Sequence, residues 1–163
     1  MTGLYHIAWA RSLPSIATRG LVASGGSGIA RQDSAYAEHS RGRLFATELD
    51  GVRFWYGIAE NHANDRSDDP LREGFTPVVL RFPDVRRKEI DPVGSDDAGA
   101  YAFVLTRVRI PPAFIEVWTG GAWVPIRAWR RVQPRRAYDF EREDGQVLAF
   151  FKERSPLIPP GAR

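Results

Sequence analysis

The sequence predicts an α+β fold with most of its helix in the first half of the chain. Two segments there, 12–20 and 50–61, combine helical spacing of apolar residues with residues typical of helix ends. After residue 76, short segments rich in β-branched and aromatic residues alternate with turn sequences. Consecutive strands joined by short turns pair antiparallel, so we expect a mainly antiparallel second half.

The first elements follow from a short apolar segment and a capped helix. Residues 4–8 predict a strand. Ser12 is a typical N-cap residue, 13–19 supply about two helical turns, and Gly20 suits the position after the helix. Residues 25–40 are rich in Gly, Ser and Ala without periodicity, and we interpret them as a functional loop.

The following elements alternate between strand and helix patterns. Residues 43–47 predict a strand, and Asp50 is expected to cap a helix that runs to about Asn61. The later strands are expected at 77–82, 101–109, 114–118, 123–126, 137–141 and 147–152.

Turn signals and proline content set the expected hairpins and the end of the domain. Gly120-Gly121 predicts a hairpin turn between two of the strands, and Asp144-Gly145 predicts another. Pro156, Pro159 and Pro160 exclude regular structure after Ser155. We therefore expect one domain, 1–154, followed by a flexible Pro/Gly tail, 155–163.

Composition excludes several classes of site. The 163 residues contain no cysteine and three histidines, which excludes disulfides, a thiol nucleophile and thiolate metal sites. We expect no metal. The sequence has no apolar run long enough to span a bilayer and no recognisable signal peptide, so a cytoplasmic protein without membrane contact is expected.

Arginine is concentrated in one window. The net charge is +3, but 117–138 contains no acidic residue and includes a cluster of arginines near Trp123 and Trp129. Planar cations beside aromatic rings suit contacts with phosphates and bases, which predicts nucleic-acid binding. A solvated cationic surface explains the pattern equally well. The residues of this cluster are Arg127, Arg130, Arg131, Arg135 and Arg136.

Common motifs for nucleotide binding and acyl transfer are missing. The segment 25–28 (GGSG) has neither the spacing nor the lysine of a phosphate-binding loop. No G-x-S-x-G occurs, so a serine nucleophile at a strand-to-helix turn is not expected.

Three segments together resemble the ADP-ribosyltransferase superfamily. Residues 4–21 (LYHIAWARSLPSIATRGL) resemble its opening strand and helix, 41–60 (RGRLFATELDGVRFWYGIAE) its second block, and 101–115 (YAFVLTRVRIPPAFI) its third. The likeness is greatest to DarT-type nucleic-acid ADP-ribosyltransferases and KptA-type RNA 2′-phosphotransferases. It implies two mostly antiparallel sheets that form a cleft.

The resemblance implies an enzyme that cleaves NAD and transfers ADP-ribose to a macromolecule, with nucleic acid preferred over protein. In such a site His6 and Tyr5 seat the ribose and nicotinamide, Tyr56 or Trp55 stacks on the nicotinamide, and Arg41 or Arg43 holds the pyrophosphate. The NAD-binding positions implied are Tyr5, His6, Ile7, Arg41, Arg43, Thr47, Trp55 and Tyr56.

The family's catalytic glutamate has no counterpart at its usual place, which falls at Ala102 or Phe103. A carboxylate there would offset the positive charge that develops on the ribose. Glu116 is our candidate substitute, which completes an expected catalytic set of His6, Tyr56 and Glu116; Asp96 and Asp97, expected on a loop, are alternatives.

Three other interpretations stay open. The missing glutamate also suits a catalytically inactive module that binds a nucleotide or RNA. The arginine content suits an RNA 2′-phosphotransferase, although His6 leaves no chain before it for that family's first lobe. Finally, His6 itself suits a half-buried strand residue whose ring bonds a main-chain carbonyl.

Overall fold

The computed structural model describes residues 3–23, 42–64, 77–106, 108–118 and 122–131. A seven-stranded antiparallel sheet organises this part of the chain, with strand order β5-β6-β3-β1-β4-β8-β9. Its strands are β1 (Gly3–Trp9), β3 (Arg43–Thr47), β4 (Pro77–Pro83), β5 (Glu89–Ile90), β6 (Ala102–Thr106), β8 (Glu116–Trp118) and β9 (Trp123–Pro125).

A short ribbon and several helices complete the described fold. The ribbon consists of β2 (Leu21–Val22) and β7 (Arg109–Ile110), which pair antiparallel. The α-helices are α1 (Leu13–Arg19), α3 (Val52–Asn64) and α4 (Pro92–Ala98). The 3-10 turns are η1 (Ala10–Ser12), η2 (Leu49–Gly51), η4 (Pro112–Phe114) and η5 (Ile126–Arg131). The predicted α+β class is confirmed.

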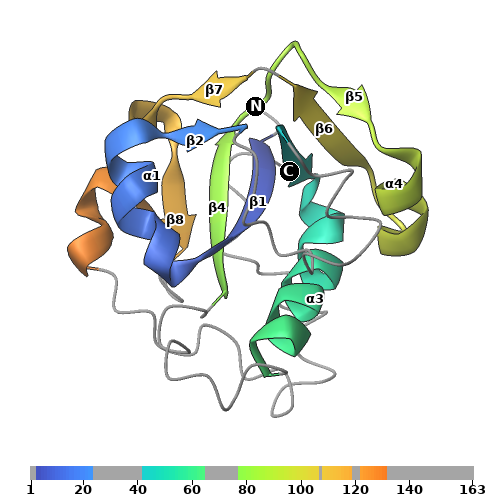
Figure 1. Ribbon diagram of the computed structural model, residues 1–163, viewed down its shortest axis with the longest axis horizontal. Helices are drawn as coiled ribbons and strands as arrows, with labels where there is room; N and C mark the ends of the chain where they lie inside the picture. The colour runs from blue at the N-terminus through green and yellow to red at the C-terminus, as the bar shows by residue number, and fades with distance from the viewer. Residues whose placement is uncertain (1–2, 24–41, 65–76, 107, 119–121, 132–163) are drawn as a thin grey trace.

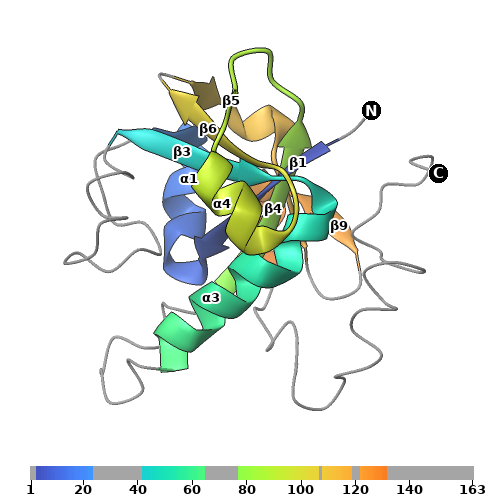
Figure 2. The same ribbon diagram turned by 90° about the vertical axis from the view of Figure 1, so that its right-hand side faces the viewer.

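The sheet carries a separate apolar core on each face. On one face, which we call the α1 face, Leu13 and Ile16 of α1 pack with alternate strand residues such as Leu80 and Leu105. On the opposite α3 face, Val52, Tyr56 and Ala59 of α3 pack against the other set, Tyr5, Ile7, Trp9, Val79 and Trp118. Figures 1 and 2 show α1 beside β2 and α3 as a separate helix that runs away from the end of β3.

The first predicted helix is confirmed to the residue. Pro14 occupies the first turn of α1, where a missing N–H costs nothing. Gly20 ends the helix with φ of 81°, and its N–H donates to the Ile16 carbonyl at 2.8 Å. Ser12 is the N-cap residue as predicted, although its side chain makes no capping hydrogen bond.

The start of the second helix differs from the prediction. Asp50 lies within η2 rather than at an N-cap, and the extended residue Glu48 precedes that turn. The Gly51 N–H donates to the Glu48 carbonyl at 3.1 Å, so a tight turn leads directly into α3. Close packing explains the turn, because a Cβ on Gly51 would lie 2.0 Å from the hydroxyl oxygen of Thr47.

The predicted strand 101–109 is two strands in the structure. β6 belongs to the main sheet and β7 pairs with β2. The hairpin predicted at Gly120-Gly121 is confirmed by the pairing of Trp118 with Trp123, although the turn itself lies outside the described residues. Of the predicted strand 114–118, Phe114 belongs to η4 and only 116–118 form a strand, β8.

Among the described strands and α-helices, β2, β5 and α4 had no sequence prediction. β5 is only two residues long, and α4 covers the segment where Asp96 and Asp97 were expected on a loop. Asp91 precedes α4 and Gly99 ends it with φ of 60°. The prediction missed α4 because its seven residues carry no sustained apolar period.

The sheet arrangement also differs from the implied pair of sheets. The described residues form one large sheet and a two-stranded ribbon. The predicted strands 137–141 and 147–152 and the tail 155–163 lie outside the described residues. None of the described helices has the length and apolarity needed to cross a membrane.

Candidate functional site

The alternation of side chains along β1 decides where each predicted site residue points. Leu4 and Ala8 belong to the core of the α1 face, and Tyr5 and Ile7 belong to that of the α3 face. Successive side chains of a strand point to opposite faces. His6 therefore lies on the α1 face, with its neighbours Tyr5 and Ile7 on the other.

His6 is the one polar strand residue on the α1 face among those that the structure describes. It is half-buried and pairs with Leu80 on β4. The register of Tyr5 with Thr47 places Ala46 beside it on β3. Because the side chain of Ala46 is small, the space next to the imidazole on the β3 side is less filled than it would be beside a larger residue.

A main-chain hydrogen bond fixes the tautomer of His6. Its Nδ1 lies 2.7 Å from the carbonyl oxygen of Phe45 on β3. Because a carbonyl only accepts, Nδ1 carries the proton, and Nε2 of the neutral ring is an acceptor. This bond matches the plainer interpretation of His6 as a strand residue held by a carbonyl, but it occupies one ring nitrogen only.

Burial keeps His6 neutral. Desolvation lowers the pKa of His6 below its ordinary value of 6.5, and the hydrogen bond to Phe45 opposes that shift only in part. The ring is therefore an uncharged acceptor at neutral pH. Such a group can accept a hydrogen bond from a hydroxyl or take up its proton.

We expect His6 to make the stability of the protein pH-dependent. The unfolded chain takes up a proton near the ordinary pKa of 6.5, whereas the folded ring resists protonation. Stability is therefore fully present above 6.5 and is lost as pH falls toward the lower folded pKa. Urea unfolding of wild type and His6→Asn at pH 7.5 and 5 checks this: wild type should lose more stability on acidification, and equal losses would contradict it.

The α3 face holds the predicted aromatic residues, away from His6. Tyr5 and Tyr56 are each 2% exposed and pack in the same core. Burial raises the pKa of Tyr5 to about 12 and also raises that of Tyr56. Trp55 is half-buried against this core and contacts Phe54 edge-on. Packed side chains fill the space between β1 and α3, so neither Tyr56 nor Trp55 shares a pocket with His6.

The other residues expected to bind NAD are also dispersed. Ile7 is a core residue of the α3 face. Thr47 is 2% exposed and donates its hydroxyl to the Tyr101 carbonyl at 3.1 Å, which is a structural role. Arg43 is exposed at the start of β3, in register with Thr106 of β6. Arg41 lies outside the described residues.

Glu116 lies on the α3 face, where it forms an ion pair. Its Oε2 accepts from Nε of Arg81 at 2.6 Å, and the same guanidinium lies 4.4 Å from the ring centre of Trp123. Nη1 of Arg81 is buried without a hydrogen-bond partner, as are the indole nitrogens of Trp118 and Trp123. Glu116 thus compensates a charge on the face opposite His6, and the structure does not bring these two residues together.

Removing this carboxylate should cost stability. In Glu116→Ala the mostly buried guanidinium of Arg81 loses its carboxylate acceptor, and we expect the free energy of unfolding to fall by about 1–2 kcal/mol. Glu116→Gln keeps a neutral acceptor and should cost less. Urea unfolding at pH 7 measures both, and an unchanged midpoint for Glu116→Ala would show that the pair contributes nothing.

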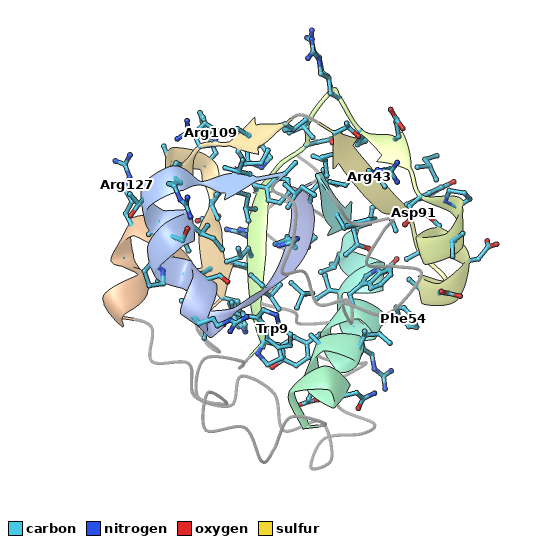
Figure 3. The ribbon with its side chains drawn as sticks, viewed as in Figure 1. Trp9, Arg43, Phe54, Asp91, Arg109 and Arg127 are labelled. Carbon is cyan, nitrogen blue, oxygen red and sulfur yellow. The ribbon has the colours of Figure 1, made fainter. Side chains whose placement is uncertain are left out.

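The predicted arginine cluster is described only in part. Arg127 is exposed on η5, whereas Arg135 and Arg136 lie outside the described residues. Arg130 and Arg131 fall within η5, and their side chains are not described. Figure 3 shows Arg127 and Arg43 on opposite sides of the molecule, so they do not belong to one surface.

Two residues of this region carried no recognised sequence signal. Phe45 acts through its carbonyl, which side-chain chemistry cannot reveal. Arg81 stands among apolar residues in β4, and an ionic residue inside an apolar strand is a signal that could have indicated a buried partner. Within the described ranges, no group of three His, Asp or Glu side chains could hold a metal ion.

Comparison of the chain with protein-family models, curated proteins and solved structures finds no match. The resemblance to ADP-ribosyltransferases thus depends on the three short segments alone. Of the site that this resemblance implies, the described residues support only the geometry of His6.

Proposed function

We propose that the protein cleaves NAD at the nicotinamide–ribose bond and transfers ADP-ribose to a macromolecular acceptor, with nucleic acid preferred. The observation that carries the proposal is the state of His6. It is a neutral, half-buried imidazole in the middle of a central strand, with Nδ1 bonded to Phe45 and Nε2 as the acceptor.

The reaction places one demand on this histidine. The glycosidic bond breaks with its electron pair leaving on nicotinamide, and the ribose carbon becomes cation-like until an acceptor oxygen or nitrogen attacks it and loses its proton. Nε2 of His6 would accept a hydrogen bond from a ribose hydroxyl and fix the sugar while charge develops. NAD would bind on the α1 face, because that is the side of β1 on which His6 lies.

Charge supports nucleic acid as the acceptor. The chain has a net charge of +3 and a pI near 9.6. Exposed guanidinium groups occur at Arg86 and Arg87 as well as at Arg127. These groups favour phosphate over a protein acceptor of average charge.

A second candidate is a catalytically inactive module that binds a nucleotide. It is favoured by the position of Glu116 on the α3 face. Among the strand residues that the structure describes, no carboxylate lies on the α1 face with His6. Such a protein would hold NAD or a related nucleotide without cleaving it.

One experiment separates the two candidates. The protein is incubated with NAD, with and without single-stranded DNA or RNA, and free nicotinamide and the mass of the nucleic acid are followed. Nicotinamide release with a matching gain of mass on the nucleic acid supports transfer. Saturable NAD binding by calorimetry without nicotinamide release supports the module. If NAD neither binds nor is cleaved, both candidates are overturned.

A further inference from the structure

The layer of α1, the β2–β7 ribbon, η4 and η5 carries positive charge without opposing carboxylates. Its buried residues belong to the core of the α1 face. The segments 10–23, 108–115 and 122–131, which form this layer, contain no Asp or Glu. A surface of one charge sign favours an anionic partner. The arginines of these segments are Arg11, Arg19, Arg109, Arg127, Arg130 and Arg131.

Two exposed guanidinium groups of this layer are anchored. Nε and Nη2 of Arg19 donate to the Ser15 hydroxyl oxygen at 3.2 and 2.6 Å. Nε of Arg109 donates to the Arg19 carbonyl at 2.9 Å. Within the described part of the chain, neither arginine forms an ion pair, and the Nη groups of Arg109 make no hydrogen bond. These groups are therefore held in place while donors remain for a planar anion such as a carboxylate.

Two exposed apolar side chains accompany these arginines. Val22 is 45% exposed and lies in register with Arg109 across the ribbon. Phe114 is 58% exposed and belongs to η4. A Cβ on Gly20 would lie 3.2 Å from Cδ of Pro112, the first residue of η4, so this turn adjoins the end of α1. Cationic and apolar groups are thus neighbours.

The ribbon directs its exposed side chains away from the sheet. Leu21 and Ile110 pair with each other and are buried in the core of the α1 face. Successive side chains of a strand point to opposite faces, so Val22 and Arg109 point outward. Figure 3 shows Arg109 beside α1, on the side of the molecule away from Arg43.

We propose that the α1–ribbon surface, defined as Arg19, Val22, Arg109 and Phe114, binds an acidic segment of a protein partner. Carboxylates of the partner accept hydrogen bonds from the two guanidinium groups. An apolar side chain between those carboxylates packs against Val22 and Phe114. The inference goes beyond the proposed function, because this partner is neither NAD nor the nucleic-acid acceptor.

The mixture of groups favours a protein over other polyanions. A nucleic acid offers phosphates to the arginines and a base to Phe114, but no aliphatic side chain to cover Val22. An anionic membrane covers apolar groups, but its mobile headgroups gain little from two guanidinium groups held at a fixed spacing. Arginine and aromatic residues are enriched in protein interfaces, and arginine clusters recognise acidic motifs.

The test uses short random peptides displayed on phage, which are selected against the wild-type protein without NAD. Enriched peptides are then synthesised and titrated by fluorescence anisotropy. We expect the enriched sequences to carry acidic residues on both sides of an apolar residue. Arg19→Gln, Arg109→Gln and Phe114→Ala should each weaken binding about tenfold.

Matched variants control for charge, aromatic content and folding. Arg87→Gln removes another exposed arginine, and Tyr101→Ala removes another aromatic ring, which is 55% exposed. Both should leave peptide affinity unchanged. Arg109→Lys keeps the charge without the planar fork and should retain only part of the affinity. Circular dichroism and urea unfolding of each variant show that it is folded.

The proposal fails if no acidic consensus is enriched, or if Arg87→Gln weakens peptide binding as much as Arg109→Gln does. It also fails if an oligodeoxythymidylate or phosphatidylserine vesicles bind more tightly than the peptides and lose binding in the same surface variants. That result would assign the surface to nucleic acid or to lipid. None of these measurements involves NAD, so their outcome is independent of nicotinamide release.

Discussion

His6→Asn is expected to reduce nicotinamide release by about a hundredfold or more while the protein remains folded. The asparagine amide can donate to the Phe45 carbonyl as Nδ1 does, so the bond between β1 and β3 is kept. It places no acceptor at the position of Nε2. The change therefore removes the proposed contact with the ribose hydroxyl and little else.

His6→Gln is the matched variant. Its longer side chain can bring the amide oxygen close to the position of Nε2, and we expect it to recover part of the activity that His6→Asn loses. Initial rates of nicotinamide release at saturating NAD, together with circular dichroism of each variant, measure both effects. Full activity in a folded His6→Asn protein would remove this histidine from the mechanism.

Gly20→Ala is expected to lower the free energy of unfolding by about 2–4 kcal/mol, more than Gly99→Ala or Gly57→Ala. Gly20 has φ of 81°, where an L-residue is strained. A Cβ there would also lie 2.1 Å from the carbonyl oxygen of Ile110, a main-chain atom that cannot rotate away. Because Ile110 pairs with Leu21, the substitution should disturb the β2–β7 ribbon as well as the end of α1.

Two other glycines separate the causes. Gly99 has φ of 60° but open space around its Cβ position, so Gly99→Ala should cost about 1 kcal/mol from backbone strain alone. Gly57 lies within α3 with neither constraint, so Gly57→Ala should stabilise the protein by about 0.5–1 kcal/mol. Thermal and urea unfolding of the three variants check the order, and a neutral Gly20→Ala would contradict the described contact.

Local signals in the sequence predicted much of the described fold. The helix at 13–19 has a proline near its start and a glycine after its end, and strand 43–47 has the expected β-branched and apolar content; both appear with the predicted bounds. The pairing of Trp118 with Trp123 follows from the two glycines between them. Each of these features depends on residues that are close together in the chain.

The candidate site was less predictable because it depends on which face of the sheet a side chain occupies. The resemblance assigned Tyr56 to the nicotinamide, but helical spacing could not tell against which face of the sheet α3 packs. That choice depends on the path of the chain after β3. A sheet also buries residues on both faces, so His6 and Tyr5 are adjacent in sequence and yet belong to opposite layers.

The division of aromatic residues between the two layers has a practical consequence for spectroscopy. Four of the five tryptophans, Trp9, Trp55, Trp118 and Trp123, belong to the core of the α3 face or pack against it. Intrinsic fluorescence therefore reports mainly on that layer. A dinucleotide that binds on the opposite face of the sheet could leave tryptophan emission almost unchanged. A dye attached near β6 is therefore the more informative reporter.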